Sequence, residues 1–364
     1  MSFEQNRPLN QMPGLDSPSI TWDQGTAYDL FISQYVLHQP EKFGLRASWA
    51  AGVRSRLSPE DRATLEIAQD VLHPLPWIYS LPAPKDGASA ISVLRQLPPA
   101  HRLPALNENP RLSLDTKELL VEVAARKTWD EHDLEVLRAG FRQSGQEIPR
   151  LKVLTNILDT WSRVEEFGEC YLEALQAFQL AFFYEEERHI APALRAGLER
   201  AQELAQELPV PELLEQLSQG IRFQELFGTS ELVLAPSYWS TPLVFLARVS
   251  SQRSLMVFGA RPEDVSLIAG EVVPDALLLS LKALADPTRL RILRFLASEP
   301  LSQVELARRL RLRAPTVTHH LSALRLAGLV QLTLKGKEER RYAARLETVS
   351  TLFAHIKEFL ESEQ

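Results

Sequence analysis

Residues 314–327 carry small polar side chains and an imidazole at helical spacing, opposite an apolar stripe. On a helical wheel, Val317, Leu321 and Leu324 point one way, with His320 beside them. The opposite face presents five residues that could reach nucleotide bases: Pro315, Thr316, Thr318, His319 and Ser322. Hydroxyl and imidazole groups on the outer N-terminal face of a helix suit hydrogen bonding to base edges in the major groove of DNA. The pattern therefore predicts a recognition helix, ending at Gly328.

Basic residues flank this helix on both sides. Four arginines lie in the segment before it, and lysines and arginines follow in a stretch with a charged turn at residues 335–339. We expect these side chains to contact the phosphate backbone, in the turn and in the wing: Arg308, Arg309, Arg311, Arg313, Lys335, Lys337, Arg340 and Arg341.

The elements that must position these groups are two shorter helices and a hairpin. Asp286 and Pro287 predict the start of the first helix, with Leu290, Ile292, Leu293 and Leu296 expected on its inward face. Ser302 and Glu305 fit a capping box opening the second helix, which we expect to pack through Val304, Leu306 and Leu310. Strands are predicted at 329–334 and 340–344, and an amphipathic helix at 346–360. This order predicts a winged helix-turn-helix domain over residues 276–364.

Charge divides the chain in the same way. Residues 276–364 hold 15 Lys/Arg and 9 Asp/Glu, a balance of +6. Of the whole-chain 40 and 47, this leaves 25 and 38 for residues 1–275, a balance of −13. Only the C-terminal part has a charge suited to a polyphosphate partner, so we expect double-stranded DNA to bind there.

The C-terminal sequence resembles the ArsR family of bacterial winged-helix regulators. The matching text is LKALADPTRLRIL, then SQVELARRL, then APTVTHHLSALRLAGLV and the strands around the wing. The resemblance covers about residues 276–361. It implies a homodimer formed through helices at about 277–285 and 346–360, recognition of an imperfect palindrome, and repression relieved by a signal.

Two departures from the family pattern argue against a metal signal. Ser302 and Val304 occupy the positions where metal-sensing members commonly carry a Cys-x-Cys pair. His355 and Glu358 supply half of another ligand set, but its other half falls on Tyr342 and Ala344. We expect no metal site, no cofactor and no catalytic residue. Arg313 also stands where a serine cap is frequent.

The remaining chain predicts a second, mainly helical domain, because 364 residues are many for one domain. The expected fold class is mainly α, with a disordered lead at 1–20, a helical sensing or dimerisation domain at 21–260, a small β element at about 231–259, a linker at 261–275, and the winged helix-turn-helix at 276–364. Glu186 and His189 give one Glu-x-x-His, and a di-iron site needs two. Cys170 is expected to be a packed thiol. The aromatic residues of this domain could enclose a pocket for a small-molecule effector.

We therefore expect a cytoplasmic, sequence-specific transcription regulator, a dimeric repressor released by a non-metal signal. The longest uncharged run is too short and proline-broken to cross a bilayer. Two alternatives stay open: a winged-helix module that docks a protein, and an enzyme domain with a DNA-binding tail.

Overall fold

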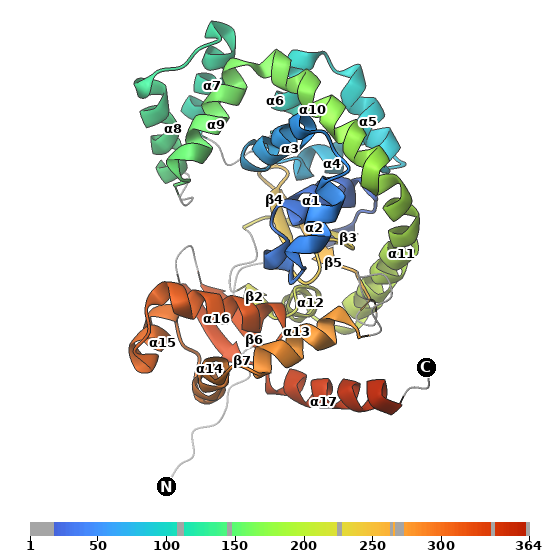
Figure 1. Cartoon of the computed structure of the whole chain (residues 1–364), viewed down its shortest axis with the longest axis vertical. Coiled ribbons are helices and arrows are strands. Elements are labelled where there is room, and N and C mark those ends of the chain that lie inside the picture. Colours follow the sequence, from blue (N-terminus) through green and yellow to red (C-terminus); the bar gives the residue numbers. More distant parts are fainter. Residues whose placement is uncertain are drawn as a thin grey trace.

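The computed structural model describes residues 18–107, 113–143, 148–223, 228–262, 265, 273–335 and 339–361. Its elements form an arc, with α7–α9 at one end, the C-terminal helices at the other, and α10 and α11 along the outer side (Figure 1). The first strand of the central sheet is followed by a long run of helices: α1 (Ala27–His38), the 3-10 helix η1 (Pro40–Phe43), α2 (Ala47–Arg54), α3 (Pro59–Val71), α4 (Leu75–Ser80), α5 (Gly87–Gln96), α6 (Pro99–Leu106), α7 (Leu114–Arg126), α8 (Glu131–Gln143), α9 (Leu151–Ser162), α10 (Val164–Phe178), the π-helix η2 (Gln179–Phe183), α11 (Tyr184–Glu207) and α12 (Val210–Leu217).

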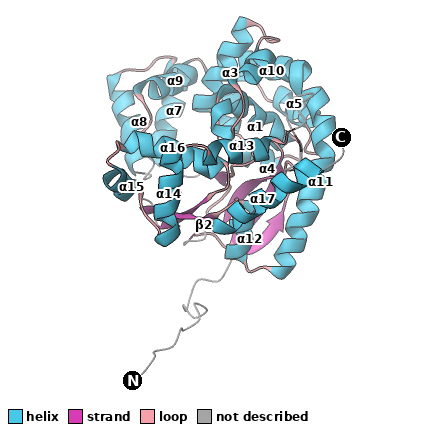
Figure 2. Cartoon of the chain, turned by 60° about the horizontal axis from the view of Figure 1, so that its bottom comes forward, coloured by secondary structure: helices cyan, strands magenta, loops and turns pink. Residues whose placement is uncertain are grey.

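A four-stranded sheet lies inside this helical body, which we define as residues 18–262. Its order is β1 (Ser19–Trp22), β3 (Glu231–Ser237), β5 (Arg253–Gly259) and β4 (Phe245–Arg248). The first three strands are parallel, and β4 runs antiparallel to β5. Figure 2 shows the strands enclosed by helices. The body is therefore a helical domain built around a small, mostly parallel sheet.

Both faces of this sheet are buried, which explains the nearly continuous apolar runs of β3 and β5. Val233 and Val257 face the core that includes α1. Their neighbours Leu234 and Met256 face a second core, shared with α11 and α12. Alternate residues point to opposite faces of a strand, so each strand contributes to two cores. A third core joins α7, α8 and α9 to α3 and α6.

Capping side chains fix several helix starts. The Ser58 hydroxyl accepts a hydrogen bond from the Asp61 amide at 3.0 Å at the start of α3. The Ser113 hydroxyl does the same for the Thr116 amide at 3.2 Å, opening α7. These bonds satisfy amides that have no partner within the helix.

The C-terminal domain, which we call the reader, follows α13 (Asp275–Leu284). It comprises α14 (Pro287–Ser298), α15 (Gln303–Leu310), α16 (Ala314–Leu326), β6 (Val330–Lys335), β7 (Glu339–Ala344) and α17 (Leu346–Glu361). β6 and β7 pair antiparallel, as expected for a wing. The short strand β2 (Ile221–Phe223) comes from the body and pairs parallel with β6, so the wing sheet has the order β2-β6-β7. The mainly α fold with a C-terminal helix-turn-helix is confirmed.

Four details of the sequence interpretation need correction. Ser19 and Ile20, expected in the disordered lead, form part of β1, while residues 1–17 lie outside the described part. Leu290 is 49% exposed and Val304 is 73% exposed, so neither packs inward as expected. Leu290 lies on the solvent face of α14 and Val304 on the solvent face of α15, while other apolar residues of these two helices fill the core. Cys170 is exposed rather than packed.

Candidate DNA-binding interface

The helix-turn-helix is shaped by local hydrogen bonds at the start of α15. The Ser302 hydroxyl accepts from the Glu305 amide at 3.3 Å, and a Glu305 carboxylate oxygen accepts from the Ser302 amide at 2.7 Å. This confirms the capping box. The Ser302 amide and the Ser302 hydroxyl both donate hydrogen bonds to this carboxylate, and these bonds lower the pKa of the Glu305 carboxyl. The helix ends at Leu310, and the left-handed backbone of Arg311 (φ 56°) then turns the chain towards α16.

The recognition helix α16 is divided into a buried and an exposed face. Val317, Leu321 and Leu324 are buried and pack with α14, α15 and β6 in the core of the reader. The five residues expected to read bases are all exposed: Pro315, Thr316, Thr318, His319 and Ser322. The structure thus brings these five side chains together on one surface, although their contact with bases stays a prediction.

Two polar side chains on α16, Thr318 and His320, differ in how they are held within the reader. The Thr318 hydroxyl donates to the Ala314 carbonyl at 3.0 Å and also accepts from the Gln303 side-chain amide. His320 is half-buried, with its Nδ1 3.9 Å from an Asp286 oxygen, and its pKa is lowered, chiefly by burial. His319 is therefore the imidazole that is available to a base, and His320 supports the helix from inside.

Arg313 occupies the N-cap position of α16, but its side chain makes no capping hydrogen bond. Four arginines around the turn are exposed, namely Arg308, Arg309, Arg311 and Arg313. Arg309 differs from the other three, because its guanidinium lies 2.7 Å from a Glu299 carboxylate oxygen. An arginine already paired with a carboxylate has less charge to offer a phosphate.

On the wing, Arg340 and Arg341 are exposed residues of β7. Arg341 also lies 3.8 Å from Glu305 and donates to the Pro300 carbonyl at 3.3 Å. Lys335 is the last residue of β6, and Lys337 lies outside the described residues. The structure therefore places the basic residues of the turn and of β7 on the same small domain as the reading face of α16.

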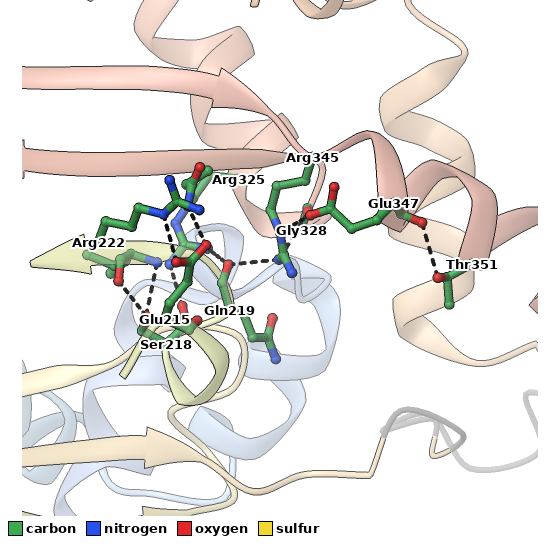
Figure 3. Close-up of polar contacts among 11 residues, drawn as sticks. Glu215, Ser218, Gln219, Arg222, Arg325, Gly328, Arg345, Glu347 and Thr351 are labelled. Atoms are coloured by element: carbon green, nitrogen blue, oxygen red, sulfur yellow. Dashed lines mark hydrogen bonds and ion pairs between the residues drawn. The ribbon is translucent and has the colours of Figure 1, made fainter. Parts of the chain in front are cut away.

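Sequence reasoning missed two arginines that join the reader to the body. Arg325 and Arg345 donate to backbone carbonyls at residues 218 and 219, beyond the end of α12 (Figure 3). A signal for Arg325 was available in the sequence, because this arginine lies four residues after Leu321 on the buried face of α16. No comparable pattern marked residues 218–223 as a partner for the wing.

We searched the described residues for places that could hold a metal ion or a small-molecule effector. Within the described ranges, no group of three His, Cys, Asp or Glu side chains is placed to hold a metal ion. His355 and Glu358 are both exposed on α17. A cavity of about 40 Å³ lies between the body and α13, lined by Gly44, Leu45, Arg46, Trp49, Asp275, Leu278, Leu279 and Lys282. Sites for small organic ligands occupy about 300–1,000 Å³, so this cavity does not fit one.

The fold and the exposed face of α16 define a winged helix-turn-helix protein. Residues 286–331 match the family model described as "Bacterial regulatory protein, arsR family". The chain thus carries an ArsR-type regulatory domain at its C-terminal end, preceded by a long helical region, and this supports a DNA-binding transcriptional regulator. The matched family is regulatory rather than enzymatic. Comparison with curated proteins and with solved structures finds no match. Among the helices that the structure describes, none is both long and apolar enough to cross a membrane.

Proposed function

We propose that the chain is a homodimeric, cytoplasmic repressor that binds an operator of imperfect palindromic sequence and is released by a non-metal signal. The observation that carries this proposal is the exposed polar face of α16 in a domain of the ArsR type. Bases would be read by the face that carries Thr316, His319 and Ser322, while the exposed arginines of the turn and β7 hold phosphates.

The dimer contact that we propose is formed by α13 and α17. Helix α17 packs against α13 and lies along the lower edge of the molecule in Figure 1. Phe353 is 63% exposed and Leu360 is 75% exposed, while Leu281 on α13 is 40% exposed. An amphipathic helix with its apolar stripe in solvent gains by covering it, and a second copy of the same pair of helices is the matching partner.

The dimer is tested by sedimentation of variants of the full chain. Phe353→Glu places a charge in the apolar stripe and is expected to convert the dimer to a monomer, because an unpaired charge in an interface is costly. His355→Glu adds the same charge at an exposed position two residues away and is expected to leave the dimer intact. A monomeric wild-type chain would refute the homodimer.

A non-metal signal is supported by the residues at the family's metal positions. Ser302 and Val304 bear no thiolate, and Tyr342 and Ala344 replace the Asp-x-His half of the other ligand set. We therefore assign reception of a non-metal signal to the helical domain at residues 21–260. Cys170 does not favour a redox signal, because partial desolvation of this exposed residue, together with Glu166 and Glu173, raises the pKa of its thiol.

The function is tested by selecting genomic fragments that bind the full chain and comparing each with scrambled DNA. His319→Ala should reduce the discrimination between operator and scrambled duplex by about 1–3 kcal/mol, the value of one base contact. Unchanged discrimination would refute the reading face. Absence of any salt-dependent affinity for duplex DNA would favour the protein-docking alternative.

A further inference from the structure

The body and the reader meet at the α12–β2 corner, defined here as residues 215–223. Helix α12 ends at Leu217, and the chain then reverses through Gln219 (φ 54°) and Gly220 (φ 98°) into β2. This turn leaves the carbonyls of Ser218 and Gln219 at the C-terminal end of α12. Carbonyls there lack partners within the helix and carry the negative end of the helix dipole.

Two arginines of the reader occupy this negative end (Figure 3). Arg325 donates to the Ser218 carbonyl at 2.6 Å and to the Gln219 carbonyl at 2.6 Å. Arg345 donates to the Gln219 carbonyl at 3.2 Å and to the Gly328 carbonyl at 3.4 Å. Arg325 is only 9% exposed, and burial followed by the charge of Arg345 lowers its pKa to about 10. The C-terminal end of the recognition helix is therefore fixed to backbone atoms of the body.

The wing is joined to the same corner by backbone pairing. Ile221 and Phe223 of β2 are in register with Leu332 and Leu334 of β6. The Leu332 amide donates to the Gly220 carbonyl at 2.9 Å, and the Gln331 side-chain amide donates to Glu215. One short segment of the body thus contacts both DNA-facing elements of the reader, α16 and the wing sheet.

This junction is mainly polar, whereas each domain has its own apolar core. In the described residues, the core of the reader is made only of side chains between Ala283 and Val349. The cores of the body include none of these residues. The domains also meet beside the corner, where Leu279 of α13 lies against Gly44 and α16 contacts η1. Because the cores are separate, the corner can open without unfolding either domain.

We propose that the α12–β2 corner is the element through which the body sets the orientation of the recognition helix and wing, with Arg325 as the positioning residue. We call the arrangement in the structure, with the corner contacts formed, the closed state. In it the reading face of α16 is exposed and the wing sheet has its third strand, so in our proposal the closed state binds DNA. A signal that moves α12 or β2 weakens DNA binding by releasing α16 and β6 together. This inference rests on the proposed function and names the route by which the body regulates it.

The experiment perturbs the corner from each side in the full chain. Arg325→Met removes the donor from the reader while keeping an unbranched side chain. Gly220→Ala acts from the body, because a φ of 98° is strained for any residue with a Cβ. Each is expected to weaken operator binding about tenfold, equivalent to about 1.4 kcal/mol. The double variant should lose less than the product of the two effects, because both break one contact.

Controls separate positioning from charge and from folding. Arg195→Met removes one positive charge from an exposed site on α11 and should leave affinity unchanged. Arg325→Lys should recover most of the lost affinity, because its ammonium can donate to the same carbonyls. Hydrogen exchange should show faster exchange of the Leu332 amide in Arg325→Met, with protection of α14 retained.

Three results would overturn the inference: wild-type affinity when the Leu332 amide has lost protection, tighter binding in either variant, or weaker binding with Leu332 still protected. The last result would assign Arg325 to a direct contact with DNA. A wild-type chain that binds no operator would instead refute the proposed function, so the two failures are distinguishable.

Discussion

Operator affinity should fall steeply with salt, and the structure gives the expected slope. Arg308, Arg311, Arg313 and Arg340 are exposed on each reader, whereas Arg309 is paired with Glu299 at 2.7 Å. Four phosphate contacts per protomer, doubled in a dimer, predict a slope of log K against log salt of about −7, from about 0.9 per neutralised phosphate. Doubling the salt concentration should then weaken binding about 100-fold.

The measurement is a titration of operator DNA by fluorescence anisotropy at a series of salt concentrations. Arg311→Gln removes two phosphate contacts from the dimer and should make the slope shallower by about 2. Arg309→Gln should change the slope less, because its charge is already offset by Glu299. Arg195→Gln, on the distant α11, is the matched control and should leave the slope unchanged.

Two results would refute this reasoning. A wild-type slope near zero would mean that the exposed arginines do not neutralise phosphates at all. A larger change for Arg309→Gln than for Arg311→Gln would mean that the Arg309–Glu299 pair opens when the domain binds DNA.

Three further predictions concern the stability of the reader. Leu321→Ala should lower the free energy of unfolding by about 2–5 kcal/mol in a denaturant titration, because Leu321 is 2% exposed and its removal leaves a cavity. Val304→Ala should change it by no more than about 0.5 kcal/mol, since Val304 lies in solvent; a larger loss would mean that a partner covers it. Hydrogen bonds from the Arg289 and Thr288 amides lower the pKa of the Asp286 carboxyl in the folded chain. The stabilisation of the fold by the ionised carboxylate is therefore present above the unfolded pKa of about 3.9 and is lost as the pH falls through the lower, folded pKa. The difference in unfolding free energy between the wild type and Asp286→Asn should shrink over that window.

The reader could be predicted from the sequence because its local signals agree with its fold. Asp286, Ser302 and Gly328 mark helix boundaries through capping preferences that depend on a few neighbouring residues. The two misassigned residues, Leu290 and Val304, belong to short helices with apolar residues on more than one face, where periodicity cannot choose the buried side.

The sheet of the body was only partly predictable. The β-rich character of 231–259 was visible, but the pairing of β1 with β3 joins residues about 210 positions apart, which no local pattern encodes. The same limit applies to the site. The residues on α16 were placed by helical spacing, whereas the partners of Arg325 are backbone carbonyls, which have no signature in side-chain sequence.

The third strand also bears on why the body and reader occur in one chain. In a two-stranded wing, β6 would present an unpaired backbone edge to solvent, and such edges invite pairing with other chains. Here β2 pairs with that edge. In the register that the structure shows, Ile221 lies opposite Leu332, and the Arg325 guanidinium at the same time reaches the Ser218 carbonyl. Backbone pairing and the arginine contacts therefore constrain each other, because a shift of β2 along β6 would move the carbonyls away from the guanidinium and leave a buried charge unpaired. Under the proposed regulation, a movement of α12 would therefore release both contacts together, as expected of a two-state element.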